Sequence, residues 1–194
     1  MEPAERYRQV AALHAAGINQ GFLATLGIPF LSLMYRAIDE SPASALIVDE
    51  AGGRVRGFVT GGVGMGPIYR RMLRHPFRLA AALLPTLVRP SRLRRVIDIL
   101  RYGNRQEAIG QLPDAELLSI AVAPESRGSG VAESLYKRLE QHFRAQGVNV
   151  FKITVGDSLA TAHRFYSRMG ATPAGKVEVH AGEGSTVYLQ RTDR

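Results

Sequence analysis

The 194-residue sequence contains no cysteine. A disulfide bond, a thiolate metal site and a cysteine nucleophile are therefore all excluded. No apolar run approaches the roughly 18 residues that a membrane-spanning helix needs; the longest, near Leu79–Pro85, is far shorter. The first ten residues carry Glu2, Glu5, Arg6 and Arg8 and lack the apolar segment of a secretory signal. These absences lead us to expect a cytoplasmic protein.

Lysine is also scarce, since only three of the 25 basic residues are lysine. The formal net charge of +8 is typical of chains that bind nucleic acid, an anionic membrane surface or an acidic small ligand, although an arginine-rich genome composition produces it as well. The basic residues cluster, because residues 67–106 hold ten arginines against the single acid Asp98. These arginines are Arg70, Arg71, Arg74, Arg78, Arg89, Arg92, Arg94, Arg95, Arg101 and Arg105.

Two helices are predicted near the start of the chain, over residues 4–16 and 29–39, because apolar residues recur there at helical spacing. Alternating apolar residues then predict a β-hairpin with strands over 45–48 and 55–60, joined by a turn over 49–53. No strand is evident before residue 4.

The arginine-rich residues 67–106 also follow helical spacing. Pro76 is placed to open a helix that Pro85 would end or kink. Ser91 suits the N-cap of a second helix, since apolar residues follow it at i, i+3, i+4 and i+7 spacing. We therefore expect a basic helical hairpin inserted into the fold.

From residue 116 onward, strands and helices alternate, which is typical of an α/β protein. The length suits a single domain with one hydrophobic core. We expect strands over 117–122 and 150–155, a helix from 131 that Gly147 ends, a helix over 158–169, and a closing hairpin with strands over 176–180 and 186–190.

The loop between the strand ending at Val122 and the following helix has the composition of a phosphate site. Its residues Arg127–Ala132 are rich in glycine. The first amides of a helix lack partners within the helix and lie at the positive end of its dipole, and glycines let a phosphate approach them. A P-loop is excluded because Gly-Lys-Ser/Thr is absent, and a dinucleotide fingerprint is excluded by Glu133, where a small residue is required.

The hexamer Arg127-Gly-Ser-Gly-Val-Ala132 resembles the Arg/Gln-x-x-Gly-x-Gly/Ala signature of the GCN5-related N-acetyltransferases, the GNAT superfamily. The preceding residues 118–125, Leu-Ser-Ile-Ala-Val-Ala-Pro-Glu, are similar to that family's fourth strand and its approach to the loop. Residues 162–170, Ala-His-Arg-Phe-Tyr-Ser-Arg-Met-Gly, resemble its A-x-x-F-Y-x-x-x-G helix.

The resemblance implies an α/β (α+β) GNAT fold over residues 1–194, with a mixed, mostly antiparallel central sheet flanked by helices. The helical insertion would lie between the third and fourth strands. It implies acetyl-CoA as co-substrate and no metal. In the family the fourth and fifth strands splay apart, and the pantetheine arm lies against the fourth. The cofactor contacts implied here are the main chain of Ile120, Ala121 and Val122, and a pyrophosphate loop of Arg127, Gly128, Ser129, Gly130, Val131 and Ala132.

The activity implied is transfer of the acetyl group to a primary amine by direct attack in a ternary complex. Tyr166 matches the tyrosine that protonates the leaving thiolate in many members, although a tyrosine packed under the sheet with its hydroxyl bonded to backbone would give the same pattern. Glu116 precedes Arg127 by the spacing of a catalytic glutamate in the family's histone-acetylating members. The alternative for Glu116 is a solvated residue at a strand start. His180 and Glu178 are second candidates for the base.

Three departures from the family pattern stand out. Leu159 replaces the usual asparagine, so its coenzyme contact is lost or moved to Asp157 or Ser158. Ala171 replaces a common phenylalanine, and the usual first strand is short or absent. His14 is expected to be structural or exposed, on a helix that lines the acceptor side in the family.

The acceptor is not identified by the sequence. An arginine-rich insertion over the groove would favour an acidic amine, such as a nucleotide-linked or lipid-linked amino sugar, or would hold the protein at an anionic membrane. A solvated face or a homodimer interface would explain the arginines equally well. Two other classes stay open: a non-catalytic CoA-binding regulator, and a nucleic-acid binder. The lack of lysine and interleaved aromatics in the insertion disfavours the latter.

Overall fold

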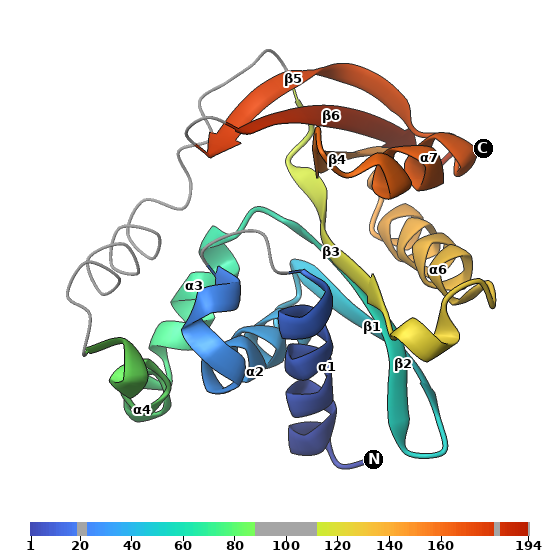
Figure 1. Ribbon diagram of the computed structural model, residues 1–194. Helices are drawn as coiled ribbons and strands as arrows, with labels where there is room; N and C mark the ends of the chain where they lie inside the picture. The colour runs from blue at the N-terminus through green and yellow to red at the C-terminus, as the bar shows by residue number, and fades with distance from the viewer. Residues whose placement is uncertain (19–22, 88–111, 181–182, 194) are drawn as a thin grey trace.

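The computed structural model describes residues 1–18, 23–87, 112–180 and 183–193 (Figure 1). For residues 24, 85–87, 178–180 and 183 it describes the backbone without the side chains. None of the helices in these ranges is both long and apolar enough to cross a bilayer.

Six strands in the described ranges form one sheet in the order β1-β2-β3-β4-β6-β5. Neighbouring strands are antiparallel except β3 and β4, which run parallel. The mixed, mostly antiparallel sheet expected from the sequence is therefore confirmed. Each predicted strand is present and longer than predicted: β1 (Ser44–Ala51), β2 (Arg54–Val63), β3 (Ala115–Val122), β4 (Val150–Gly156), β5 (Thr172–His180) and β6 (Glu183–Arg191).

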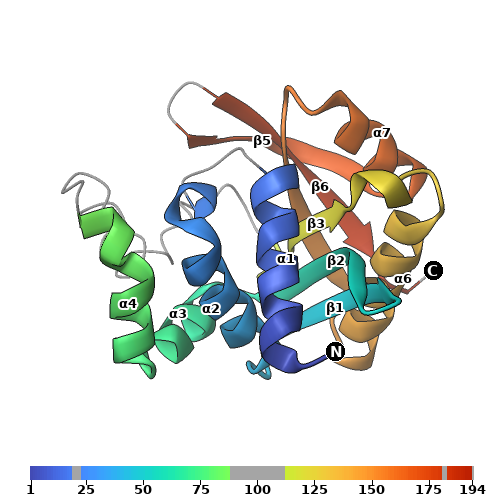
Figure 2. The ribbon, with the colours of Figure 1, turned by 60° about the horizontal axis from the view of Figure 1, so that its bottom comes forward.

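Helices cover both faces of the sheet (Figures 1 and 2). Consecutive residues of β2 show that each face of the sheet has its own hydrophobic core, because side chains alternate between the two faces of a strand. Phe58 joins the hydrophobic core formed with α1 (Pro3–Gly17) and α2 (Gly27–Asp39), whereas Val59 joins the core formed with α6 (Val131–Ala145) and α7 (Ala160–Arg168). These four helices agree closely with the sequence prediction. Residues 1 and 2, ahead of α1, form no strand.

Glycines on β2 bring α6 directly onto the sheet. A Cβ atom on Gly61 would lie 2.7 Å from both Leu139 Cδ1 and Phe143 Cζ of α6, and one on Gly57 would lie 2.9 Å from Val131 Cγ1. Such approaches are shorter than real carbon–carbon contacts, so a side chain at either position would force the α6 side chains to move. This close contact fixes the start of α6, and with it the loop at 127–132, relative to β3.

Two helices follow β2 at the position of the predicted insertion: α3 (Gly66–Leu73) and α4 (Pro76–Leu87). The start of α4 at Pro76 was predicted, but the helix continues through Pro85, so that proline does not end it. The separate helix α3 was not predicted. The helix predicted after Ser91 lies outside the described residues. Both α3 and α4 pack against α2, so they extend the helical layer on one side of the molecule (Figure 2).

Candidate functional site

The parallel strands β3 and β4 pair over only two positions, Glu116 with Lys152 and Leu117 with Ile153. The register between β2 and β3 skips Leu118, which is the extra residue of a β-bulge. A bulge bends its strand, and here it lies where the pairing with β4 ends. From residue 118 to 122, β3 pairs with β2 alone, so its other edge offers backbone donors and acceptors to a ligand.

This open edge leads to the loop that the sequence suggested as a phosphate site. Gly128 and Gly130 have φ of +77° and +81°, which L side chains rarely adopt, and nothing lies within 4 Å of either added Cβ. Other residues would be strained at these two positions because of the backbone conformation, although there is space for a side chain. Ser129 Oγ donates a hydrogen bond of 2.6 Å to the Ser126 carbonyl and holds the turn. No side chain caps the N-terminus of α6 at Gly130.

Two charged side chains flank that helix terminus. Arg127 is exposed, and its Nε donates to the Val122 carbonyl at 3.4 Å, which places the guanidinium between the end of β3 and the loop. Glu133 accepts from Arg168 Nη2 of α7 at 2.7 Å. The pKa of Glu133 is lowered by a hydrogen bond from its own backbone amide and by Arg168. The Arg168 pairing offsets a negative charge that would otherwise repel a phosphate.

Glu116 lies where β3 and β4 separate. Its side chain is 18% exposed, and Thr154 Oγ1 of β4 donates to its Oε1 at 3.1 Å. Lys152 Nζ is 3.9 Å from Oε2 and also donates to the Pro113 carbonyl at 3.0 Å. Glu116 is thus partly buried and held between two β4 side chains, instead of being solvated. These contacts fix the position of the carboxylate.

Tyr166 of α7 is 5% exposed and packs among aromatic rings, 6.0 Å from Tyr136 and 6.4 Å from Tyr188 between ring centroids. Burial raises the pKa of its hydroxyl above the ordinary value, so the group stays protonated at neutral pH. In the described residues no hydrogen bond to this hydroxyl is found, so the backbone bond considered above is not seen there. The hydroxyl is chemically a proton donor.

One turn before Tyr166 lies a histidine that the sequence did not single out. His163 Nε2 is 3.1 Å from the Gly156 carbonyl and its Nδ1 is 2.8 Å from the Tyr188 hydroxyl. A carbonyl only accepts, so Nε2 carries the proton and Nδ1 accepts from Tyr188. This assignment links α7 to the end of β4 and to β6. Only the tertiary arrangement brings these groups together.

A buried polar chain connects the first two helices to β3. His14 Nδ1 is 2.5 Å from the Tyr35 hydroxyl, which is 3.4 Å from Ser119 Oγ, which in turn is 2.6 Å from Thr60 Oγ1. Burial lowers the pKa of His14 to about 4, so the ring is neutral at physiological pH. Of the two expectations for His14, the structural one agrees with this placement and exposure does not.

The other residues considered from sequence fall in different places. Leu159 is 41% exposed and begins α7 without a side-chain cap. Asp157 accepts from Thr186 Oγ1 at 2.7 Å and from Lys176 Nζ at 3.2 Å, so it is engaged by the β5–β6 hairpin. Ser158 is exposed. The side chains of His180 and Glu178 lie outside the described residues.

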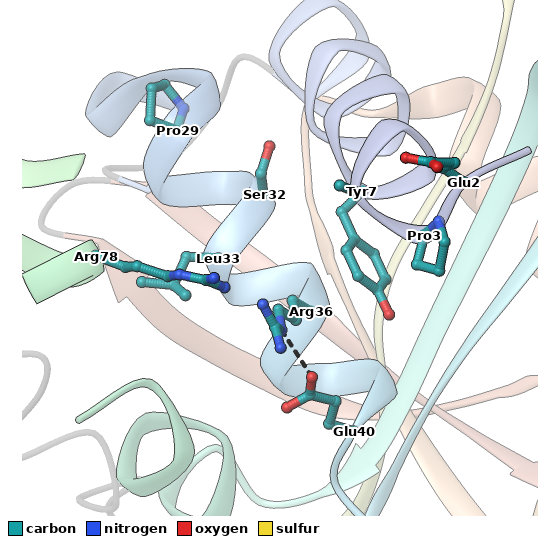
Figure 3. Close-up of a pocket in the computed structure, with 10 residues that line it drawn as sticks. Glu2, Pro3, Tyr7, Pro29, Ser32, Leu33, Arg36, Glu40 and Arg78 are labelled. Carbon is teal, nitrogen blue, oxygen red and sulfur yellow. Dashed lines mark hydrogen bonds and ion pairs between the residues drawn. The ribbon is translucent and has the colours of Figure 1, made fainter. Parts of the chain in front are cut away.

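A cavity of about 550 Å³ lies between α1, α2 and α4 (Figure 3). Its polar lining includes Arg36, Glu40 and Arg78, and Arg36 Nε donates to Glu40 at 2.7 Å. The cavity reaches Tyr7 near the start of α1, whereas the end of α1 at Gly17 lies against β3. None of the residues that line this cavity belongs to β3, β4 or the loop at 127–132.

The comparisons with known proteins agree with this geometry. A family model described as the acetyltransferase (GNAT) family matches residues 16–171. The chain belongs to the GNAT acetyltransferase family. No curated protein shows a significant sequence match.

Solved structures share the fold at low sequence identity. An N-acetyltransferase from Staphylococcus aureus Mu50 has a TM-score of 0.63 at 15% identity, covering 98% of this chain and 94% of its own. Ard1 from Thermoplasma volcanium has a TM-score of 0.59 at 14% identity, with coverages of 98% and 93%. A proposed streptothricin acetyltransferase from Bacillus anthracis str. Ames, solved in complex with acetyl coenzyme A, has a TM-score of 0.53 at 12% identity, with coverages of 81% and 67%.

Proposed function

We propose that residues 1–194 form one domain that transfers the acetyl group of acetyl-CoA to a primary amine by direct attack in a ternary complex. The observation that carries the proposal is the parting of β3 and β4 directly before a glycine loop and an uncapped helix N-terminus. An extended, amide-rich arm ending in a pyrophosphate requires these two features in this order. The structural neighbour that holds acetyl-CoA supports the choice of donor.

The donor would lie along the open edge of β3. Ile120, Ala121 and Val122 would exchange main-chain hydrogen bonds with the pantetheine arm, as an added strand does at a sheet edge. The pyrophosphate would accept from the amides of the loop and of the first turn of α6, with Arg127 adding a positive charge. Ser158 is the exposed polar group near Leu159 that is free to take over the contact of the missing asparagine.

The chemistry requires two proton movements. As the amine nitrogen attacks the thioester carbon, the carbon–sulfur bond breaks, the amine loses a proton and the departing thiolate gains one. Glu116 would accept the amine proton, directly or through a water molecule, because Thr154 and Lys152 hold its carboxylate at the inner end of the gap. Tyr166 would donate to the thiolate, since burial keeps its hydroxyl protonated.

An acidic amine is the acceptor class we propose within this reaction. Residues 66–87, which contain α3 and α4, carry four arginines and no aspartate or glutamate: Arg70, Arg71, Arg74 and Arg78. Six further arginines of the insertion lie outside the described residues, between 89 and 105. A negatively charged acceptor would be attracted by this field, whereas a cationic polyamine would be repelled.

The direct test is release of free CoA from acetyl-CoA in the presence of a panel of amines, which includes amino sugars, sugar-nucleotide amines and a polyamine. We expect amine-dependent thiol release, fastest with an anionic acceptor. CoA binding without turnover on any amine would favour a non-catalytic regulator instead.

A further inference from the structure

The helix α4 has an unusual surface, because both of its faces are apolar. Leu79 and Ala82 are buried and pack with the core around α2. The opposite stripe consists of Phe77, Ala80, Ala81 and Leu84, which follow i, i+3, i+4 and i+7 spacing and are all exposed. We call these four residues the α4 stripe.

The stripe projects strongly into solvent. Phe77 is 89% exposed and Leu84 is 59% exposed, and Leu73 at the end of α3 is 51% exposed. These are three of the seven exposed large apolar side chains in the described residues. A row of exposed large apolar side chains is normally covered by a second surface. Figure 2 shows α4 at the outer edge of the molecule, beyond α2 and away from the sheet.

The charge next to the stripe has one sign. Residues 66–87 contain four arginines and no aspartate or glutamate. Arg71 is paired with Glu40 at 3.4 Å. Arg70 and Arg74 are exposed and form no ion pair with any residue that the structure describes. Arg70 and Arg74 precede Phe77 in the chain by seven and three residues.

From this arrangement we propose that α3 and α4 form a docking surface for an anionic lipid bilayer, apart from the β3–β4 gap and the loop at 127–132 proposed for acetyl-CoA. A bilayer with acidic headgroups supplies both requirements: negative charge for Arg70 and Arg74, and an acyl boundary for Phe77 and Leu84. Nucleic acid supplies the charge but no acyl region for the apolar α4 stripe. The surface binds peripherally, with the α4 stripe in the plane of the interface.

The chain contains no tryptophan, so a single introduced indole is an unambiguous reporter. Phe77→Trp places it at the most exposed position of the α4 stripe. The matched control is Gln141→Trp, at an exposed position of α6. Each variant is titrated with vesicles of phosphatidylcholine alone and with vesicles of phosphatidylcholine and phosphatidylglycerol in equal parts, with no acetyl-CoA or amine present.

We expect the emission of the Phe77→Trp variant to shift to the blue with the anionic vesicles only, while the Gln141→Trp variant stays unchanged. Adding Arg70→Gln and Arg74→Gln to the reporter is expected to weaken binding about 30-fold, since each basic residue contributes about 1 kcal/mol at an anionic surface. High salt is also expected to weaken binding, because it screens the attraction between the arginines and the acidic headgroups.

Three results would overturn the proposal. Emission that is already blue without vesicles at every protein concentration would mean that another part of this chain covers the stripe. A blue shift that grows with protein concentration alone would mean that a second copy covers it. A response to duplex DNA and none to anionic vesicles would assign the arginines to nucleic acid. Because donor and acceptor are absent, none of these outcomes bears on acetyl transfer.

Discussion

Thr154 of β4 donates a hydrogen bond of 3.1 Å to Glu116 of β3, across the point where these two strands part. The same carboxylate is 3.9 Å from the ammonium of Lys152, which lies opposite Glu116 in the parallel register. The short pairing of β3 with β4 therefore also fixes the position of the Glu116 carboxylate at the inner end of the gap.

Glu116→Gln is expected to lower kcat by about 100-fold, a typical contribution of a general base. The KM for acetyl-CoA should change little, because the proposed donor contacts lie further along β3. Steady-state rates across pH give the measurement, and the variant should lose the acidic limb of the wild-type profile. Thr154→Val is the matched control and should reduce kcat less, since the carboxylate remains. An unaltered pH profile in Glu116→Gln would remove this residue from the base role.

Tyr166→Phe is expected to lower kcat more than it weakens coenzyme binding. The ring contacts with Tyr136 and Tyr188 are kept, whereas the proton donor is lost. We expect a reduction of about 10- to 100-fold in kcat, somewhat below the usual range for acid catalysis because water can partly replace the donor. Calorimetric titration with CoA measures the strength of coenzyme binding. Unchanged turnover would assign Tyr166 to packing alone.

The pH dependence of stability should report His14. Its pKa is about 4 in the folded protein, against 6.5 for an ordinary histidine. Between these values the unfolded chain binds a proton that the folded chain does not, so the free energy of unfolding falls as pH decreases from 6.5 toward 4. The loss is on the order of 3 kcal/mol.

Urea unfolding at several pH values gives the slope. His14→Gln should flatten this slope, although the contact with Tyr35 is lost in the variant. An identical slope in wild type and His14→Gln would mean that other groups cause the acid sensitivity.

Gly61→Ala is expected to destabilise the fold by about 1–3 kcal/mol, because the new methyl group would overlap Leu139 and Phe143 and push α6 away from β2. Gly175→Ala on β5 is the control, since nothing lies within 4 Å of its added Cβ and its φ is not positive. Chemical denaturation measures both. Equal stabilities of the two variants would contradict the close packing of α6 on β2.

Local patterns were enough to predict most of the secondary structure. The apolar run before Val122, the glycine loop and the amphipathic helix after it depend on neighbouring residues, so the sequence predicts them and their order. The family resemblance suggested a coenzyme role for this loop, and that role stays a prediction. The helix starting at Pro76 was predicted, but its extension through Pro85 was not, because packing against α2 outweighs the local preference for a break.

Features that depend on distant residues could not be predicted. The bulge at Leu118 is a matter of register between β2 and β3, and no local signal marks it. The chain of contacts from His14 to Ser119 joins three elements far apart in the sequence. No local pattern distinguishes His163 from other helix residues, and its contact with Tyr188 of β6 arises only in the folded structure. Glu116 could be proposed as a base from its spacing, but its neighbours on β4 emerge only in the structure.

Calorimetric titration with CoA tests the central claim most directly, because the whole account depends on the gap and loop holding that molecule. We predict saturable binding to the wild-type protein, and binding weakened about 10-fold in Arg127→Gln, which removes one charge-assisted contact to the pyrophosphate. Absence of binding to the wild-type protein would contradict the assignment of residues 127–132 to the pyrophosphate. Equal affinity for CoA and for pantetheine, which lacks the pyrophosphate, would contradict it as well.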